Sequence, residues 1–187
     1  MSVSMKAQRR PGLLAEFGIA RPAAFTAVLV AALAIQSTLL TKVTLFGVIP
    51  QLVFVVVVVI AYLEGERVGL CVGFAAGLLL DFQLPESILG LTALVYTLVG
   101  YGVGIVRHYI PSSSVWTPVF GVALASAVAE GSYAALAIMM GERWVSIANT
   151  AKIAGLVVLY NTLLTPFVFP LVKKVADKVR PERVIRI

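Results

Sequence analysis

Two carboxylates are the residues of this chain with the greatest chemical potential, because both fall in or beside apolar stretches. Asp81 ends the run Leu78-Leu79-Leu80, and Glu130 lies near the middle of an apolar segment. A charged side chain is costly inside a bilayer, so such residues are functional candidates by default. Glu130 fits a partner-binding, proton-linked or ligand-binding carboxylate, or a structural hydrogen-bonding residue. Asp81 fits a helix cap, an outward pocket shared with Glu86, or an interfacial loop carboxylate.

No catalytic constellation accompanies them. The chain has one histidine, His108, and one cysteine, Cys71, which exclude a multi-histidine metal site and an internal disulfide. Neither a phosphate-binding loop, a dinucleotide fingerprint nor a nucleophile elbow is present. Glu130 has no titratable neighbour within helical reach, so a general acid/base pair cannot be argued. We therefore expect no enzymatic activity, no cofactor and no metal.

The composition indicates an integral membrane protein. Of 187 residues, 60% are hydrophobic and only 13% are charged, with a mean hydropathy of +0.99. A soluble domain of this size could not cover so much apolar surface with so little charge. The net charge of +6 comes from residues that flank apolar segments. It therefore favours contact with membrane lipid over nucleic acid.

Six apolar segments predict an all-α bundle of six transmembrane helices. The β-branched run in the second segment would suit a strand in water, but lipid leaves an open strand unpaired and favours a helix. The third segment is short against the roughly 20 residues a bilayer needs, so it either extends through Phe82 and Leu84 or pairs with the second in a thinned bilayer. Pro166 and Pro170 predict a kink or a frayed end. The segments are 22–40, 47–63, 68–80, 88–106, 115–140, and from 148 or 152 to 172.

The positive charges predict that both termini are cytoplasmic. With that orientation only Lys42, Arg143 and Lys152 fall outside, and the other basic residues near the spans fall inside. We divide the chain into a basic cytoplasmic segment (1–21), a transmembrane domain (22–172) and a basic cytoplasmic tail (173–187).

Small and polar residues within the spans predict how the helices pack. Glycines recur every fourth position, which leaves a strip of bare backbone on one helix face and lets another helix approach closely. Such a strip serves either internal packing or a partner. Gln36 and Asn161 are polar residues within spans, where amides usually hydrogen-bond between helices. The glycines are Gly69, Gly73 and Gly77 in one row and Gly100 and Gly104 in another.

The order of these features resembles the rod shape-determining membrane protein family MreD. The resemblance covers the first four spans in order and rests on the succession of the motifs at these spacings. The matching residues are Leu33-x-x-Gln36-Ser37, Gly47-x-x-Pro50-x-Leu52, Gly65-x3-Gly69-x3-Gly73-Phe74-x2-Gly77-Leu78-Leu79-x-Asp81 and Leu89-Gly90-Leu91-x-Ala93-Leu94. Gln51 departs slightly from the family pattern, and the last two spans add little beyond Asn161 and Pro166.

The resemblance implies a function that composition alone does not show. Members are non-enzymatic proteins of the bacterial inner membrane. They belong to the complex that elongates the cell, the elongasome, and support peptidoglycan synthesis and cell shape. They bind MreC directly, and through it associate with MreB, RodA and a class B penicillin-binding transpeptidase. Their fold is thought to be similar to that of the S-components of energy-coupling-factor transporters.

Two functions are therefore weighed. The first is a scaffold on which the transmembrane helix of MreC docks, with the glycine row of span 68–80 as the first candidate surface. The second is an S-component-like subunit of a vitamin transporter, with an outward pocket formed by Asp81, Glu86 and the loop of Trp144. Few aromatic residues are available in the outer loops for such a pocket. An intramembrane enzyme is the least favoured alternative.

Overall fold

Each of the six predicted apolar segments forms one α-helix. The computed structural model describes residues 20–42, 44, 47–83, 88–109, 116–141 and 147–179, without the side chains of 147–149. Within these ranges the structure is helical and has no strand, which confirms the all-α prediction. Its elements are α2 (Ala20–Thr38), the 3-10 turn η1 (Leu40–Lys42), α3 (Leu52–Glu64), α4 (Glu66–Gln83), α5 (Leu91–Val106), α6 (Thr117–Met139) and α7 (Ile147–Val179).

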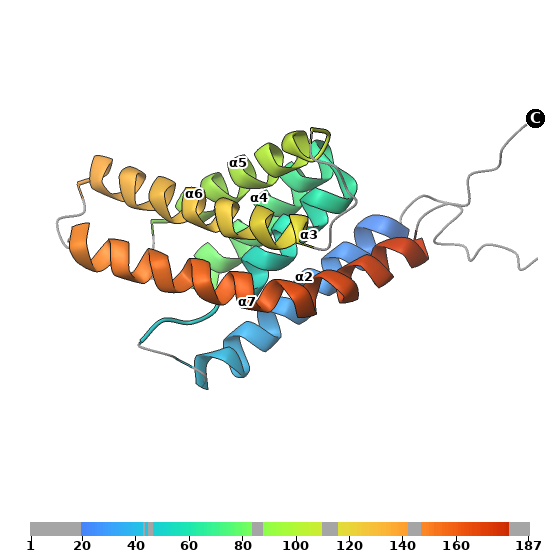
Figure 1. Ribbon diagram of the computed structural model, residues 1–187, viewed down its shortest axis with the longest axis horizontal. Helices are drawn as coiled ribbons and strands as arrows, with labels where there is room; N and C mark the ends of the chain where they lie inside the picture. Colours follow the sequence, from blue (N-terminus) through green and yellow to red (C-terminus); the bar gives the residue numbers. More distant parts are fainter. Residues whose placement is uncertain are drawn as a thin grey trace, which may run out of the picture.

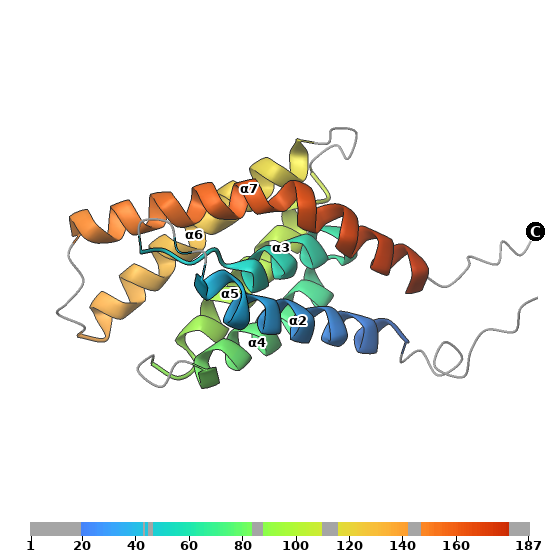
Figure 2. The same ribbon diagram turned by 90° about the horizontal axis from the view of Figure 1, so that it is seen from below.

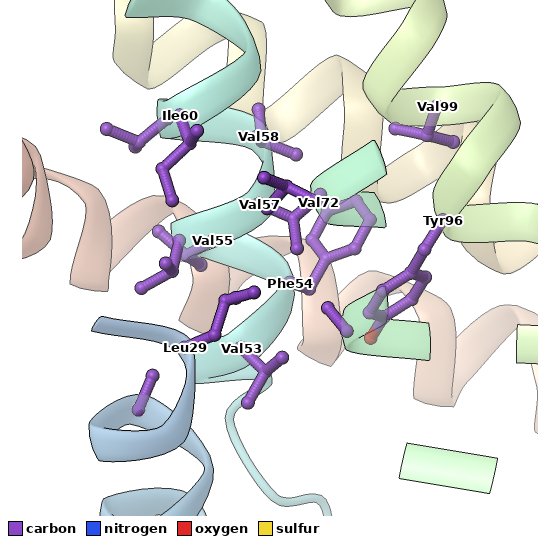
Figure 3. Packing of buried hydrophobic residues seen from close by; sticks show 14 of the residues in the cluster. Leu29, Val53, Phe54, Val55, Val57, Val58, Ile60, Val72, Tyr96 and Val99 are labelled. Atoms are coloured by element: carbon purple, nitrogen blue, oxygen red, sulfur yellow. The ribbon is translucent and has the colours of Figure 1, made fainter. Parts of the chain in front are cut away.

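Helix α3 is the centre of the bundle. Every residue from Val53 to Ala61 is buried, and α3 contacts each of the other five α-helices. A helix that is apolar all round must be covered on all sides. Figure 3 shows its valines and Phe54 packed against residues of neighbouring helices. The rings of Phe54 and Tyr96 lie edge to face, with their centroids 5.0 Å apart. The β-branched run is therefore a helix, as its membrane setting predicts.

The remaining helices surround α3 in contacting pairs. Helix α4 packs against α5, and α6 packs against α7; these last two run side by side in Figure 1 and cross at an angle in Figure 2. Helix α2 contacts α3, α4 and α7. In both views the start of α2 and the end of α7 lie at the same end of the molecule. This placement agrees with an even number of crossings, while the side that faces the cytoplasm stays a prediction.

Three helical segments are long and apolar enough to cross a membrane: Ala20–Lys42, Thr117–Met139 and Thr150–Val179. Helices α3 and α5 are apolar but shorter. The 13 residues of α3 rise only about 20 Å, against a hydrocarbon core of about 30 Å. An integral membrane protein is thus supported, and the count of six spans stays a prediction.

Two helices are longer than the segments predicted from the sequence. Helix α4 begins at Glu66 and reaches Gln83, which agrees with the alternative that span 68–80 extends through Phe82. Helix α7 continues through Pro166 and Pro170 to Val179, so the described part of the expected 173–187 tail is helical. Val172 and Ala176 are buried four residues apart, which explains the extension. Figure 2 shows α7 bending in this half.

Candidate functional site

The glycines of α4 and α5 pack against each other. A Cβ added at Gly69 or at Gly100 would overlap the other's carbonyl group. One at Gly73 would overlap the Tyr96 carbonyl, and one at Gly77 would lie 2.5 Å from the Cα of Ala93. Gly104 packs just as closely on the start of α4. The two backbones therefore touch along the pair, which only residues without a side chain allow.

This packing corrects the docking surface expected for the glycine row of span 68–80. The row is already covered by α5, so a partner helix cannot lie on it in this structure. Gly102 and Gly121 behave differently, because a Cβ at either position would meet nothing within 4 Å. Both line an apolar groove of about 270 Å³ between α5 and α6.

Asp81 caps the start of α5. Its side chain is buried, with 1% exposed. Oδ2 accepts hydrogen bonds from the backbone N–H groups of Gly90 (2.9 Å) and Ala93 (3.1 Å), and Oδ1 accepts one from that of Thr92 (3.3 Å). A carboxylate at a helix N-terminus satisfies its unpaired N–H groups and is favoured by the helix dipole. Of the alternatives for Asp81, this geometry fits the helix cap. Glu86 lies outside the described residues.

The start of α3 is held by two amide side chains from distant helices. Oε1 of Gln36 on α2 accepts a hydrogen bond of 2.9 Å from the backbone N–H of Val53. Asn161 of α7 accepts the backbone N–H of Gln51 at 3.1 Å through Oδ1. These N–H groups have no partner within the helix, so both amides act as remote caps. The central helix is therefore fixed at this end by α2 and α7 together.

Glu130 belongs to the same polar cluster. The side-chain amide of Gln51 donates to Oε1 of Glu130 at 2.8 Å. Asn161, which is fully buried, also donates through Nδ2 to the hydroxyl of Ser126 at 3.1 Å, one turn from Glu130 on α6. The hydroxyl of Thr165 bonds back to the Asn161 carbonyl at 2.7 Å. Three of the four polar candidates, Gln36, Glu130 and Asn161, thus meet at the start of α3.

A cavity of about 200 Å³ adjoins this cluster. Its polar lining comes from Gln36, Gln51, Thr92, Tyr96, Glu130 and Tyr133. Such a lining offers hydrogen-bond donors and acceptors to water or to a small polar molecule. Its one carboxylate, that of Glu130, is accompanied by the hydroxyls of Tyr96 and Tyr133, and the lining contains no histidine, lysine or second carboxylate. Among the described residues, no group of three histidine, cysteine or acidic side chains could hold a metal.

The opposite end of the bundle carries charged contacts. Arg21 pairs with Glu64 at 3.4 Å, and the imidazole of His108 lies 3.5 Å from the carboxylate of Glu66. Arg107 donates to a carbonyl near the end of α3 at 3.3 Å. The backbone N–H at Glu66 and its hydrogen bond with His108 hold the pKa of the Glu66 carboxyl below its usual value. Arg21 and Arg107, both expected on the cytoplasmic side, thus lie at the same end of the bundle, beside the end of α3.

Sequence reasoning missed the central role of Gln51. Gln51 follows Pro50 at the start of the apolar run, but its side chain does not cap α3 and bonds Glu130 of α6 instead, so a search for helix-capping residues would not find this role. Sequence reasoning also assigned no contact to Ser126, which bonds Asn161, or to Tyr96, which packs on Phe54. Arg143 and Trp144, together with residues 1–19 and 180–187, lie outside the described residues.

Comparison with known proteins gives one match. The family model described as rod shape-determining protein MreD matches residues 21–175. This range includes nearly all of the helical bundle. Neither a curated protein nor a solved structure matches the chain.

Proposed function

We propose that this chain, which belongs to the MreD family of rod shape-determining proteins, is a non-enzymatic component of the bacterial cell-elongation complex. In this role it sits in the inner membrane with both termini in the cytoplasm. It binds MreC directly and, through MreC, associates with MreB, RodA and a class B penicillin-binding transpeptidase. By holding these proteins together it supports peptidoglycan synthesis along the cell wall.

The family match is the observation that carries this proposal, since it extends over residues 21–175. The structure adds support of a different kind. Gln36, Asp81, Glu130 and Asn161 all make hydrogen bonds that join helices of the chain to one another. Structural bonds of this type suit a rigid scaffold that presents helix faces to membrane partners.

The groove between α5 and α6 replaces the row of α4 as our candidate surface for the transmembrane helix of MreC. Gly102 and Gly121 face open space on opposite sides of this groove, and its walls are apolar. Bare backbone facing lipid lets a partner helix approach closely, as the α4–α5 pair shows within this chain. MreC docks here with small side chains against the two glycines.

A pull-down of the tagged protein from its native membrane in mild detergent tests the proposal, with mass spectrometry as the readout. We expect to recover MreC, with RodA and its transpeptidase in lower yield. The second candidate function is an S-component-like transport subunit, which the polar cavity beside Gln36 and Glu130 favours. Recovery of a transporter ATPase with its coupling membrane subunit, and no MreC, would support that alternative and overturn the scaffold.

Two matched variants test the groove within the same experiment. Gly121→Leu fills the α5–α6 groove, whereas Gly131→Leu adds the same side chain to α6 away from this groove. Neither position has a neighbour within 4 Å of an added Cβ, so both variants should fold. We expect Gly121→Leu to reduce MreC recovery and Gly131→Leu to leave it unchanged. Equal recovery with both would place the docking surface elsewhere.

A further inference from the structure

A second cleft, between α2 and α4, combines basic and apolar residues in an order that matches a phospholipid. It has a volume of about 400 Å³ and is polar at one end, where Arg21, Glu64 and Arg67 lie. The walls beyond them are mostly apolar and include Phe25 and Leu29 from α2 and Val68, Val72 and Ala75 from α4. From Arg21 to Leu29 the wall rises about 12 Å, close to the roughly 15 Å of one hydrocarbon leaflet.

The polar end of the cleft contains buried hydrogen-bonding groups without a partner among the described residues. Arg21 pairs with one oxygen of Glu64, but Nε of Arg21 and Oε1 of Glu64 are buried and have no partner among the described residues. Buried polar groups are normally satisfied, so such a pair indicates a missing ligand or water. Arg67 is exposed and makes no ion pair with the described residues. Two arginines and one glutamate thus line the polar end of this apolar cleft.

We propose that this cleft binds an anionic glycerophospholipid. Its phosphate lies between Arg21 and Arg67, which suit the geometry of phosphate oxygens. One acyl chain lies along Phe25 and Leu29. Basic clefts between helices on the cytoplasmic side are a recognised setting for acidic head groups. The predicted topology places the Arg21 end on that side, where such lipids are plentiful. The bound lipid adds a link between α2 and α4, whereas the ion pair of Arg21 with Glu64 joins α2 to the end of α3.

Native mass spectrometry on the full-length protein tests this proposal. The protein is purified from nanodiscs with equal amounts of phosphatidylglycerol and phosphatidylcholine of the same acyl chains, and retained lipid is counted. Each basic residue near an anionic head group changes lipid affinity about fivefold. We expect phosphatidylglycerol to be retained several-fold over phosphatidylcholine, and the preference to be lost in the double variant Arg21→Ala, Arg67→Ala.

Two further variants make the result specific to the cleft. Glu64→Gln removes the carboxylate that competes with the phosphate, so it should increase the preference for phosphatidylglycerol. Lys174→Ala removes an exposed positive charge from α7, outside the cleft, and should leave the preference unchanged. Equal retention of the two lipids by the unaltered protein would overturn the proposal. So would a preference that survives in the double arginine variant, or one that falls in Glu64→Gln.

Discussion

Removing the carboxylate of Asp81 should weaken the bundle more than any other single change among the four polar candidates. In Asp81→Ala three backbone N–H groups at the start of α5 lose their acceptor. Two of these bonds, from Gly90 and Ala93, are short, and a hydrogen bond to a charged group is worth about 1.5–3 kcal/mol. The longer bond from Thr92 adds little. We expect a loss of about 4 kcal/mol in unfolding free energy, whereas Asp81→Asn, which keeps one acceptor oxygen, loses about half as much.

Thermal unfolding in detergent combined with hydrogen exchange measures this effect. Asp81→Ala should unfold about 10 °C below the unaltered protein, and the amides of Gly90 and Ala93 should exchange faster. Glu66→Gln is the matched control, since Glu66 lies on the same helix at the opposite, solvent-exposed end. It should shift the unfolding temperature little. Unchanged unfolding and exchange in Asp81→Ala would refute the reasoning that this carboxylate caps α5.

Three further predictions follow from the other contacts. Gly73→Leu should lower the free energy of unfolding by at least about 3 kcal/mol and reduce the yield of folded protein on size exclusion, because the added side chain forces α4 and α5 apart. Gly102→Leu should have neither effect. Glu130→Gln can still accept a hydrogen bond from Gln51, so we expect normal cell shape from pH 6 to 8; a defect confined to one end of that range would instead indicate a proton-linked role. Because the folded pKa of Glu66 is lowered, its contribution to stability is present above the ordinary value of 4.5 and is lost as the pH falls through the folded pKa. The unaltered protein should therefore melt slightly above Glu66→Gln at neutral pH, and this small difference should disappear in strong acid.

The apolar pattern of the sequence was enough to predict the helices but not their partners. The spacing of Gly69, Gly73 and Gly77 shows which residues share a face, because that follows from 3.6 residues per turn. It does not show what covers the face. Whether α5 or another protein packs there is set by contacts between helices, which the spacing within one helix does not contain. Of the two roles weighed for this row, internal packing agrees with the close approach of α5, and a docking surface for a partner helix does not.

The polar contacts were harder to predict, because each joins residues far apart in the chain. Gln51 bonds to Glu130 and Asn161, which are 79 and 110 residues away. A search along one helix therefore found no partner for Glu130. Asp81 was closer to prediction, since a helix cap was among its alternatives and Gly90 is only nine residues away. Local chemistry could suggest the cap, but only the fold shows which N–H groups it satisfies.

Depletion of the protein from its native bacterium tests the central claim most directly. Cell width and length are followed by microscopy over several generations, with a plasmid copy of the gene as the control. A component of the elongation complex should be needed for rod shape, so we predict that cells widen and become round and that the plasmid copy restores rods. Cells that keep normal rod dimensions after the protein has gone would contradict this account, and growth that then depends on an added vitamin would favour the transport subunit.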